Sequence, residues 1–206
     1  MNFVKNKPDK KTYVIQSIVA AAVIAAVLVF DLVTKYITST RIGLYEKVQI
    51  IPNFFYFTYV QNTGGAWSLG DDNPVLMNII KVLTVFFVLA VLFVLYVPDK
   101  RKNLYLVFSF ALLASGATGN FIDRVWLGYV RDFISFYIFG YRFPVFNIAD
   151  IALVTGVIML IVSIIIYFVK TEMRQRKEKS AKRQAGENGD DPSDGSENGK
   201  DGGADA

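Results

Sequence analysis

Four long apolar stretches divide this chain of 206 residues and limit what it can fold into. They cover approximately residues 13–35, 74–97, 104–122 and 150–169. A helix needs about 20 apolar residues to cross the hydrocarbon core of a bilayer, and each stretch is about that long or slightly longer. Hydrophobic residues make up 53% of the sequence, which is too many for an ordinary soluble domain when they lie in blocks. The sequence therefore predicts an all-α polytopic membrane protein with four transmembrane helices.

The first apolar stretch follows a short basic N-terminus, residues 1–12, as the core of a secretory signal peptide would. It is long, however, it lacks a clear cleavage site of small residues, and it runs directly into Asp31 and Lys35. We therefore interpret it as a retained transmembrane helix. Continued helix would place these two residues on one face at the membrane boundary, where an interfacial salt bridge with a snorkelling lysine explains them equally well.

The second and third stretches carry local signals of helix structure. Asn73 and Pro74 read as a helix cap followed by proline at the first helical position. Ala111, Ser115 and Gly119 recur every four residues and predict a stripe of small side chains suited to close helix packing in lipid.

The connections on one side of the predicted bundle are rich in aromatic residues. Residues 48–52 and 54–60 are β-branched and aromatic, so they predict a small β-element of short strands. Residues 62–68, which contain paired glycines, follow as a turn that either approaches a ligand or is an ordinary glycine turn. The later connection carries Phe133, Phe136, Tyr137, Phe139, Tyr141 and Phe143. We expect it to be an aromatic-rich outer loop, either an interfacial belt or, as we favour, a mobile cover that bends at Gly140.

Positive charge predicts the orientation of the helices. Basic residues concentrate in the N-terminus, in residues 98–103 and in residues 170–183, which lie on one side of a four-helix arrangement. This side should be cytoplasmic, so both termini are expected there and the small β-element is expected outside. Basic charge also occurs in nucleic-acid-binding proteins, but the membrane spans explain it more simply, and no nucleic-acid partner is expected.

The chain is expected to divide into four parts: the N-terminus, a membrane domain over residues 13–170, a basic juxtamembrane segment over 171–185, and a tail over 186–206. The tail carries seven acidic residues and one basic residue and has almost nothing apolar. Such a segment buries too little surface to offset its ordering entropy, so we expect it to be disordered.

Two absences narrow the chemistry. The sequence contains no histidine, which excludes a Ser-His-Asp triad and histidine-ligated metals. It contains no cysteine, which excludes disulfides, thiol nucleophiles and thiolate zinc sites. Carboxylates, a Ser-Lys pair, or no catalytic groups at all remain.

Polar residues instead gather at one level of the predicted bundle. Between residues 115 and 150 they are Asn120, Asp123, Arg124, Asp132, Asn147 and Asp150. With the predicted orientation, these residues and those at positions 31 and 62 all reach the outer membrane boundary. Polar groups beside membrane spans are costly and suggest a functional site, although helix caps and one ion pair would explain each residue alone. Together they favour a site with two carboxylates.

Four motifs in this order resemble those of the lipoprotein signal peptidases, or signal peptidase II family. The motifs are Asp31-x-x-Thr34-Lys35, Asn62-Thr-Gly-Gly-Ala66, Gly119-Asn120-x-x-Asp123-Arg124 with Val130-x-Asp132-Phe133, and Phe146-Asn147-x-Ala149-Asp150. They span nearly the whole predicted membrane region. The chain departs from the family pattern at Leu32, where glutamine is usual, and at Gly65-Ala66-Trp67, where Ala-Ala-Phe is usual. The second departure could reshape a substrate loop.

The resemblance implies an aspartic endopeptidase of the bacterial inner membrane, with its site at the extracytoplasmic face. Its substrates would be lipidated prolipoproteins in the bilayer, cut just before the diacylglyceryl-modified cysteine. The family's catalytic dyad maps onto Asp132 and Asp150. Its substrate contacts map onto Asn62, Asn120 and Arg124, with Asp31, Lys35, Asp123 and Asn147 supporting the site. The resemblance implies no metal or other cofactor, and we expect a monomer.

Elementary chemistry agrees with such a dyad, because two adjacent carboxylates share a proton and can act together as base and acid. The main alternative is a small transporter or proton-translocating protein, which would also use intramembrane carboxylates. A Ser-Lys protease built from Ser39 or Ser68 with Lys35 would need a neutral lysine, which a neighbouring aspartate disfavours. A membrane scaffold without catalytic activity would leave the gathering of polar groups unexplained.

Overall fold

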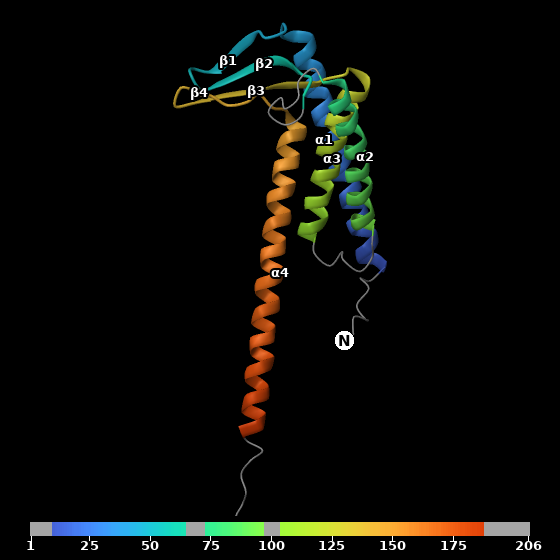
Figure 1. The fold of residues 1–206 in the computed structure, drawn as a ribbon, viewed down its shortest axis with the longest axis vertical. Coiled ribbons are helices and arrows are strands. Elements are labelled where there is room, and N and C mark those ends of the chain that lie inside the picture. Colours follow the sequence, from blue (N-terminus) through green and yellow to red (C-terminus); the bar gives the residue numbers. More distant parts are fainter. Residues whose placement is uncertain (1–9, 65–72, 97–103, 188–206) are drawn as a thin grey trace, which may run out of the picture. The chain divides into compact units, whose positions relative to one another are not determined.

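The computed structural model describes residues 10–64, 73–96 and 104–187, with side chains described up to residue 180 (Figure 1). Residues 1–9, 65–72, 97–103 and 188–206 lie outside the described residues. The predictions for Gly65-Ala66-Trp67, for Ser68 and for a disordered tail therefore fall outside them as well.

Four helices in the described part of the chain are long and apolar enough to cross a membrane, as predicted. They are α1 (Lys10–Arg41), α2 (Pro74–Tyr96), α3 (Leu104–Trp126) and α4 (Ile148–Glu187). The first, third and fourth are longer than their apolar stretches. The added residues of α3 include Asp123, which is paired inside the protein, whereas the described residues added at the C-terminal ends of α1 and α4 are mostly exposed.

Asn73 caps α2 as predicted. Its side-chain oxygen accepts hydrogen bonds from the backbone amides of Val75 and Leu76, each at 3.1 Å. The cap satisfies two of the amides that a helix leaves unpaired at its N-terminus, and Pro74 needs no such partner.

The described part of the chain divides into two compact units, one ending at Ser163 and the other beginning at Ile164. The second contains the remainder of α4, in which the predicted juxtamembrane segment is helical and its described side chains are mostly exposed. Arg174 and Glu178 form an exposed ion pair there at 3.0 Å, four residues apart on the helix. Such pairs contribute little to stability, so this segment depends on helix propensity rather than on packing.

Helix α3 is the most buried of the four within the first unit. Ala111 and Ser115, from the predicted small-residue stripe, are fully buried. At Gly119 an added Cβ would lie 2.5 Å from the carboxylate of Asp31, so only glycine permits this approach of α3 to α1. Two clusters of buried apolar residues, one containing Ala111 and the other Leu113, pack α3 against its neighbours.

A four-stranded antiparallel sheet joins the helix ends within the first unit (Figure 1). Its strands are β1 (Lys47–Ile51), β2 (Phe55–Asn62), β3 (Val130–Ile138) and β4 (Tyr141–Arg142), in that order. The first two confirm the predicted β-element. Strand β1 follows α1 and β3 follows α3, so the sheet lies at the end of the bundle where these two helices end.

The aromatic connection expected as an outer loop is largely folded into this sheet. Phe136 of β3 lies opposite Phe55 of β2, and the two rings stack with centroids 4.9 Å apart. Phe139 and Gly140 both have positive φ, 50° and 81°, and form the tight turn into β4. The alternating aromatic side chains therefore pair across strands, and the positive φ at Gly140 serves a hairpin turn.

Candidate active site

Helix α4 begins with a reciprocal pair of hydrogen bonds between Asn147 and Asp150. The backbone N–H of Asp150 donates to Asn147 Oδ1, and the backbone N–H of Asn147 donates to Asp150 Oδ2, each at 3.0 Å. This is a capping box, with asparagine as the cap and the carboxylate at the third helical position. The local sequence at this helix start therefore fixes where the Asp150 carboxyl points.

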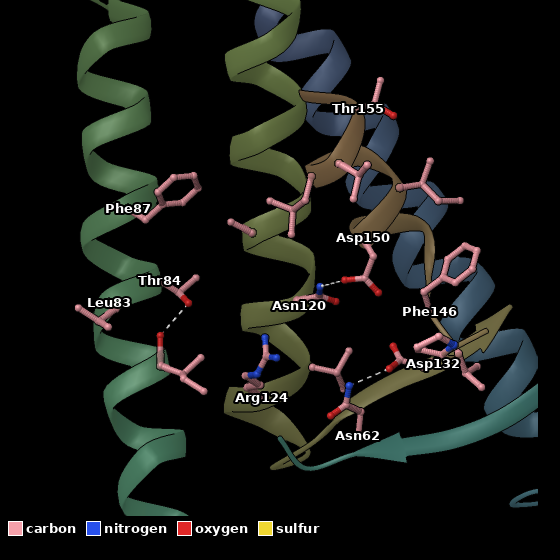
Figure 2. Close-up of a pocket in the computed structure, with 18 of the residues that line it drawn as sticks. Asn62, Leu83, Thr84, Phe87, Asn120, Arg124, Asp132, Phe146, Asp150 and Thr155 are labelled. Atoms are coloured by element: carbon pink, nitrogen blue, oxygen red, sulfur yellow. Dashed lines mark hydrogen bonds between the residues drawn. The ribbon is translucent and has the colours of Figure 1, made fainter. Parts of the chain in front are cut away.

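Asp132, the second carboxyl group of the site, lies on strand β3 and is 3% exposed. Asn62, at the end of β2, donates from its side-chain Nδ2 to Asp132 Oδ2 at 3.0 Å (Figure 2). The Asn62 side-chain oxygen is already used, because it accepts from the backbone N–H of Gly64 at 3.0 Å. This bond orients the Asn62 amide so that its NH₂ group faces the carboxylate.

Asn147 connects the two aspartates. Its side-chain Nδ2 donates to Asp132 Oδ1 at 2.6 Å and to Asn120 Oδ1 at 3.1 Å. Because its backbone N–H also donates to Asp150 Oδ2, this single buried residue contacts both carboxyl groups. The structure thus brings together the two residues that the family resemblance assigns to the dyad.

Asn120 of α3 holds the other side of Asp150, donating from Nδ2 to Asp150 Oδ1 at 2.7 Å (Figure 2). Its side-chain oxygen accepts from Lys35 Nζ at 3.0 Å. A lysine ammonium can only donate, so it selects the oxygen of the amide and leaves the NH₂ group for the carboxylate. Lys35 therefore determines the orientation of Asn120.

Lys35 and Asp31 form a buried ion pair, with 2.7 Å between Nζ and Oδ2 and side-chain exposures of 0% and 1%. Full burial excludes the snorkelling lysine at a membrane interface that the sequence alone left open. Asp31 Oδ1 also accepts from the backbone N–H of Ala149 at 2.9 Å, so α1 supplies a second cap to α4 next to Asp150. The pair acts as part of the site rather than as a surface salt bridge.

Asp123 of α3 lies behind this pair, with Oδ2 at 3.6 Å from Lys35 Nζ. Asp123 also forms an ion pair with Arg131, a residue to which the sequence alone assigned no role. The guanidinium of Arg131 lies 2.6 Å from Asp123 Oδ1 through NH2, and 3.2 Å from Oδ2 through Nε. Its place immediately before Asp132, on the opposite face of a strand, was the available signal.

Arg124 lies on the side of α3 that faces Asn62 and Asp132 (Figure 2). Its NH2 group donates to the carbonyl oxygen of Gly64 at 3.2 Å. Its Nε is buried and makes no hydrogen bond to any described residue. This arginine therefore holds Gly64, just beyond the end of β2, and also lines the space in front of the two aspartates.

That space is a pocket of about 800 Å³ between α2, α3 and the start of α4. Helix α2 lines it with Leu83, Thr84 and Phe87, and α4 contributes an apolar wall that extends past Asp150 to Thr155 (Figure 2). The polar lining gathers at one end and includes Asn62, Asn120, Arg124, Asp132 and Asp150. An extended apolar ligand could lie along the helices with its polar end at the carboxylates.

The electrostatics of the two carboxyl groups favour a shared proton. Burial, and after it the charge of Asp150, raise the pKa of Asp132 from its ordinary value of 3.8 to about 7. The hydrogen bonds from Asn62 and Asn147 oppose this rise in the pKa because they stabilise the carboxylate, and the charge of Lys35 opposes it less. An acid that titrates near neutral pH can both give and take a proton under ordinary conditions.

Other chemistries have weaker support at this end of the bundle. Ser39 donates to the backbone oxygen of Tyr36, and the ammonium of Lys35 is engaged by Asp31 and Asn120, so these residues do not form a Ser-Lys pair. Within residues 10–64, 73–96 and 104–187, the structure holds no group of three carboxylate, histidine or cysteine side chains placed to bind a metal ion.

Comparison with known proteins places this network in a family. A sequence profile of signal peptidase (SPase) II matches residues 23–166, a range that contains every residue of the network. The chain belongs to the signal peptidase II family. The match confirms the resemblance carried by the four motifs. Signal peptidases II are proteases, so this chain belongs to a family of enzymes.

Individual relatives of the signal peptidase II family agree with this assignment. The lipoprotein signal peptidases of Staphylococcus aureus strains MRSA252 and JH9 are each 37% identical over 172 residues, which is 84% of this chain and 99% of theirs. Two solved structures of a bacterial membrane enzyme, determined by the in meso method at 1.9 Å and 2.3 Å resolution, match with TM-scores of 0.63 and 0.64. They are 38% and 37% identical, and the matches cover 71% of this chain and 92% and 87% of theirs.

Proposed function

We propose that this protein is an aspartic endopeptidase that removes signal peptides from lipidated prolipoproteins, cutting before the diacylglyceryl-modified cysteine. The observation that carries the proposal is that Asn147 donates to the carboxyl groups of both Asp132 and Asp150, at the polar end of an apolar pocket. Relatives named lipoprotein signal peptidase, similar over most of their length, support the choice of substrate.

The proposed reaction uses the two aspartates and one water molecule. Asp150 lies at the N-terminus of α4 and accepts hydrogen bonds from two N–H groups, and we assign it the role of the base. Asp132 is the more buried, and its pKa of about 7 makes it the holder of the shared proton. Asp150 takes a proton from the water as the water oxygen attacks the scissile carbonyl, and Asp132 gives its proton to the carbonyl oxygen.

The resulting tetrahedral intermediate then collapses. The proton held by Asp150 passes to the departing nitrogen of the modified cysteine, Asp132 recovers its proton from a hydroxyl of the intermediate, and the carbon–nitrogen bond breaks. One water is consumed, and both aspartates return to their starting protonation states. Arg124, whose guanidinium stays protonated, contributes binding rather than proton transfer.

The pocket suits a substrate that is apolar on both sides of the cleaved bond. Signal peptides are apolar helices, and the diacylglyceryl chains belong to the lipid phase, so the apolar wall built by α2 and α4 can accept them. The position of the dyad at the end of the helices matches a cleavage site at the membrane surface. We further propose that this end is extracytoplasmic, with both termini in the cytoplasm, because the basic residues lie in the segments on the other side.

A transporter is less well supported by the described residues. A pathway would need ionisable groups along the length of the bundle, whereas the buried ionisable groups gather at the sheet end: Asp31, Lys35, Asp123 and Asp132. The isolated buried Gln16, Ser109 and Ser163 in the remaining helix length do not make such a pathway.

The test is cleavage by the purified full-length protein in lipid nanodiscs. The substrate is a synthetic prolipoprotein peptide with a diacylglyceryl cysteine, and the products are identified by mass spectrometry. We expect a single cut before the modified cysteine, loss of the cut in Asp132→Asn, and no cut in the matched peptide without lipid. A cut elsewhere, or equal cleavage by Asp132→Asn, would exclude the proposed mechanism.

A further inference from the structure

Beside the pocket lie two pairs of consecutive residues with opposite charge, and in each pair one residue lines the pocket while the other lies behind it. Asp123 and Arg124 are consecutive on α3, and Arg131 and Asp132 are consecutive on β3. One member of each pair, Arg124 and Asp132, lines the pocket. The other members, Asp123 and Arg131, meet behind it in an ion pair.

The rear ion pair is well defined and largely shielded from solvent. Its side chains are 1% exposed for Asp123 and 14% exposed for Arg131. The guanidinium reaches both carboxylate oxygens, at 2.6 Å and 3.2 Å, in the bidentate arrangement that restricts geometry most. Asp123 Oδ2 also accepts from the backbone N–H of Arg131 at 3.0 Å.

We propose that Arg131 is a positioning residue for the peptidase reaction. Through Asp123 it holds Asp132 at the pocket wall and leaves the charge of Lys35 to the Asn120–Asp150 side of the site. The inference rests on the proposed function, since it assumes that Asp132 and Asp150 carry out the cleavage.

The geometric part follows from strand alternation. Side chains of consecutive strand residues point to opposite faces, so fixing Arg131 behind the sheet fixes Asp132 in front of it. On α3, the same contact fixes Asp123 and therefore its neighbour Arg124. The backbone bond from residue 131 to Asp123 does not depend on the side chain, so a variant at this position keeps the strand attached while it loses the bidentate contact.

The electrostatic part follows from the charges that surround the dyad. Besides the two dyad aspartates, the charged residues near the dyad are Asp31 and Lys35 of α1, Asp123 and Arg124 of α3, and Arg131 of β3. The side chains of α2 and β2 that line the pocket are uncharged. Tyr129 stays neutral in the working range, because a hydrogen bond with Tyr59, and secondarily burial, raise its pKa to about 12. The positive and negative charges are nearly balanced when the dyad holds one proton.

Removing the charge of Arg131 upsets this balance. Lys35 Nζ already lies 3.6 Å from Asp123 Oδ2, and it would be drawn toward that carboxylate and away from Asn120. The dyad would then sit in a more negative surrounding and hold its protons more tightly. The pH profile of cleavage should move to higher pH, by roughly half a unit or more for a charge in a partly buried site.

The experiment compares pH profiles of kcat and KM for full-length variants in nanodiscs, with a lipidated peptide that has no titratable group near the cut. Arg131→Met should lower kcat about tenfold and move the profile to higher pH, with a smaller effect on KM. Asp123→Asn, which removes the opposite charge, should move the profile to lower pH. Arg142→Met is the matched control, because it removes the same charge from exposed strand β4 of the same sheet, and it should behave as the wild type.

Opposite shifts for the two variants distinguish an electrostatic and positioning role from simple destabilisation, which would lower activity without such a pattern. If Arg131→Met fails to fold, Arg131→Lys decides the question: it should keep the wild-type pH profile but lose kcat, because it retains the charge without the bidentate geometry. A folded Arg131→Met with the kcat and pH profile of Arg142→Met would overturn the inference. Activity retained by Asp132→Asn would instead refute the proposed function.

Discussion

Asn147 and Asp150 are held to each other at the start of α4 by two reciprocal hydrogen bonds of 3.0 Å each. The two residues that cap the helix also take part in the candidate site. The asparagine that caps α4 still has its NH₂ group free to reach Asp132, and the carboxylate that completes the cap faces the pocket. A common stabilising motif therefore places both proposed catalytic groups, and several measurable consequences follow from its geometry.

Asp132→Asn and Asp150→Asn should each reduce cleavage by roughly 100- to 10,000-fold, the usual contribution of a general acid or base. Both variants keep a side chain of the same size that can still accept a hydrogen bond. The measurement is the initial rate of lipidated peptide cleavage at equal amounts of folded protein. Glu46→Gln is the control, since that exposed carboxylate accepts a hydrogen bond from the backbone N–H of Gly43, away from the two aspartates. Near-normal turnover in either dyad variant would rule out the assignment.

The rate of cleavage should fall as the pH rises past about 7. Asp132 is the proposed proton donor, and its pKa of about 7 means that the shared proton is lost in this range. A profile of kcat/KM from pH 4 to pH 10, recorded with a non-titrating substrate, measures this limb. A rate that stays constant up to pH 9 would show that the proton is held elsewhere.

The stability of the protein should also depend on Asp132. Its pKa is about 7 in the folded protein and near 3.8 when unfolded, so the folded state binds more protons between these values and the free energy of unfolding decreases as the pH rises. The slope is at most about 1.4 kcal/mol for each pH unit. Asp132→Asn cannot ionise, so in thermal unfolding it should gain stability over the wild type at pH 8 and much less at pH 5. An equal difference at both pH values would contradict the assigned pKa.

Gly119→Ala should impair activity although glycine is not part of the chemistry. The added methyl group would lie 2.5 Å from Asp31 Oδ2, whose carboxylate caps α4 beside Asp150. We expect a loss of about tenfold or more in kcat and a lower unfolding temperature, because a rigid helix contact must open. Gly43→Ala is the matched control: its added methyl group meets only the end of the exposed Glu46 side chain, which can move away. Equal behaviour of the two variants would show that the α1–α3 contact does not position the site.

Arg124→Lys should weaken substrate binding more than it changes the pH profile. Lysine keeps the charge but loses the planar fork that reaches Gly64 and the pocket together. We expect KM to rise roughly 10-fold, about the value of one hydrogen bond to a charged group. The kinetic constants across the pH range provide the measurement, and a shifted pH optimum with unchanged KM would argue for a role in proton transfer.

Local sequence was sufficient for the helices and for the identity of the polar residues. A lipid-facing segment must satisfy its own backbone hydrogen bonds, so an apolar stretch of the right length becomes a helix whatever surrounds it. The cap at Asn73 and the four motifs could be read in the same way, from residues close together in the chain.

Contacts between distant residues were decided only by the tertiary structure. Asn62 and Asp132 are 70 positions apart, and their bond exists because β2 and β3 pair side by side in a particular register. The sequence left open whether Lys35 is an interfacial lysine or part of a site, because its burial depends on Asp31 and on Asn120 of another helix. The sequence alone assigned no role to Arg131, because its contact with Asp123 forms only where β3 packs against α3. Local patterns determine which elements form, whereas register, burial and charge pairing depend on how those elements pack, and this packing assembles the candidate site.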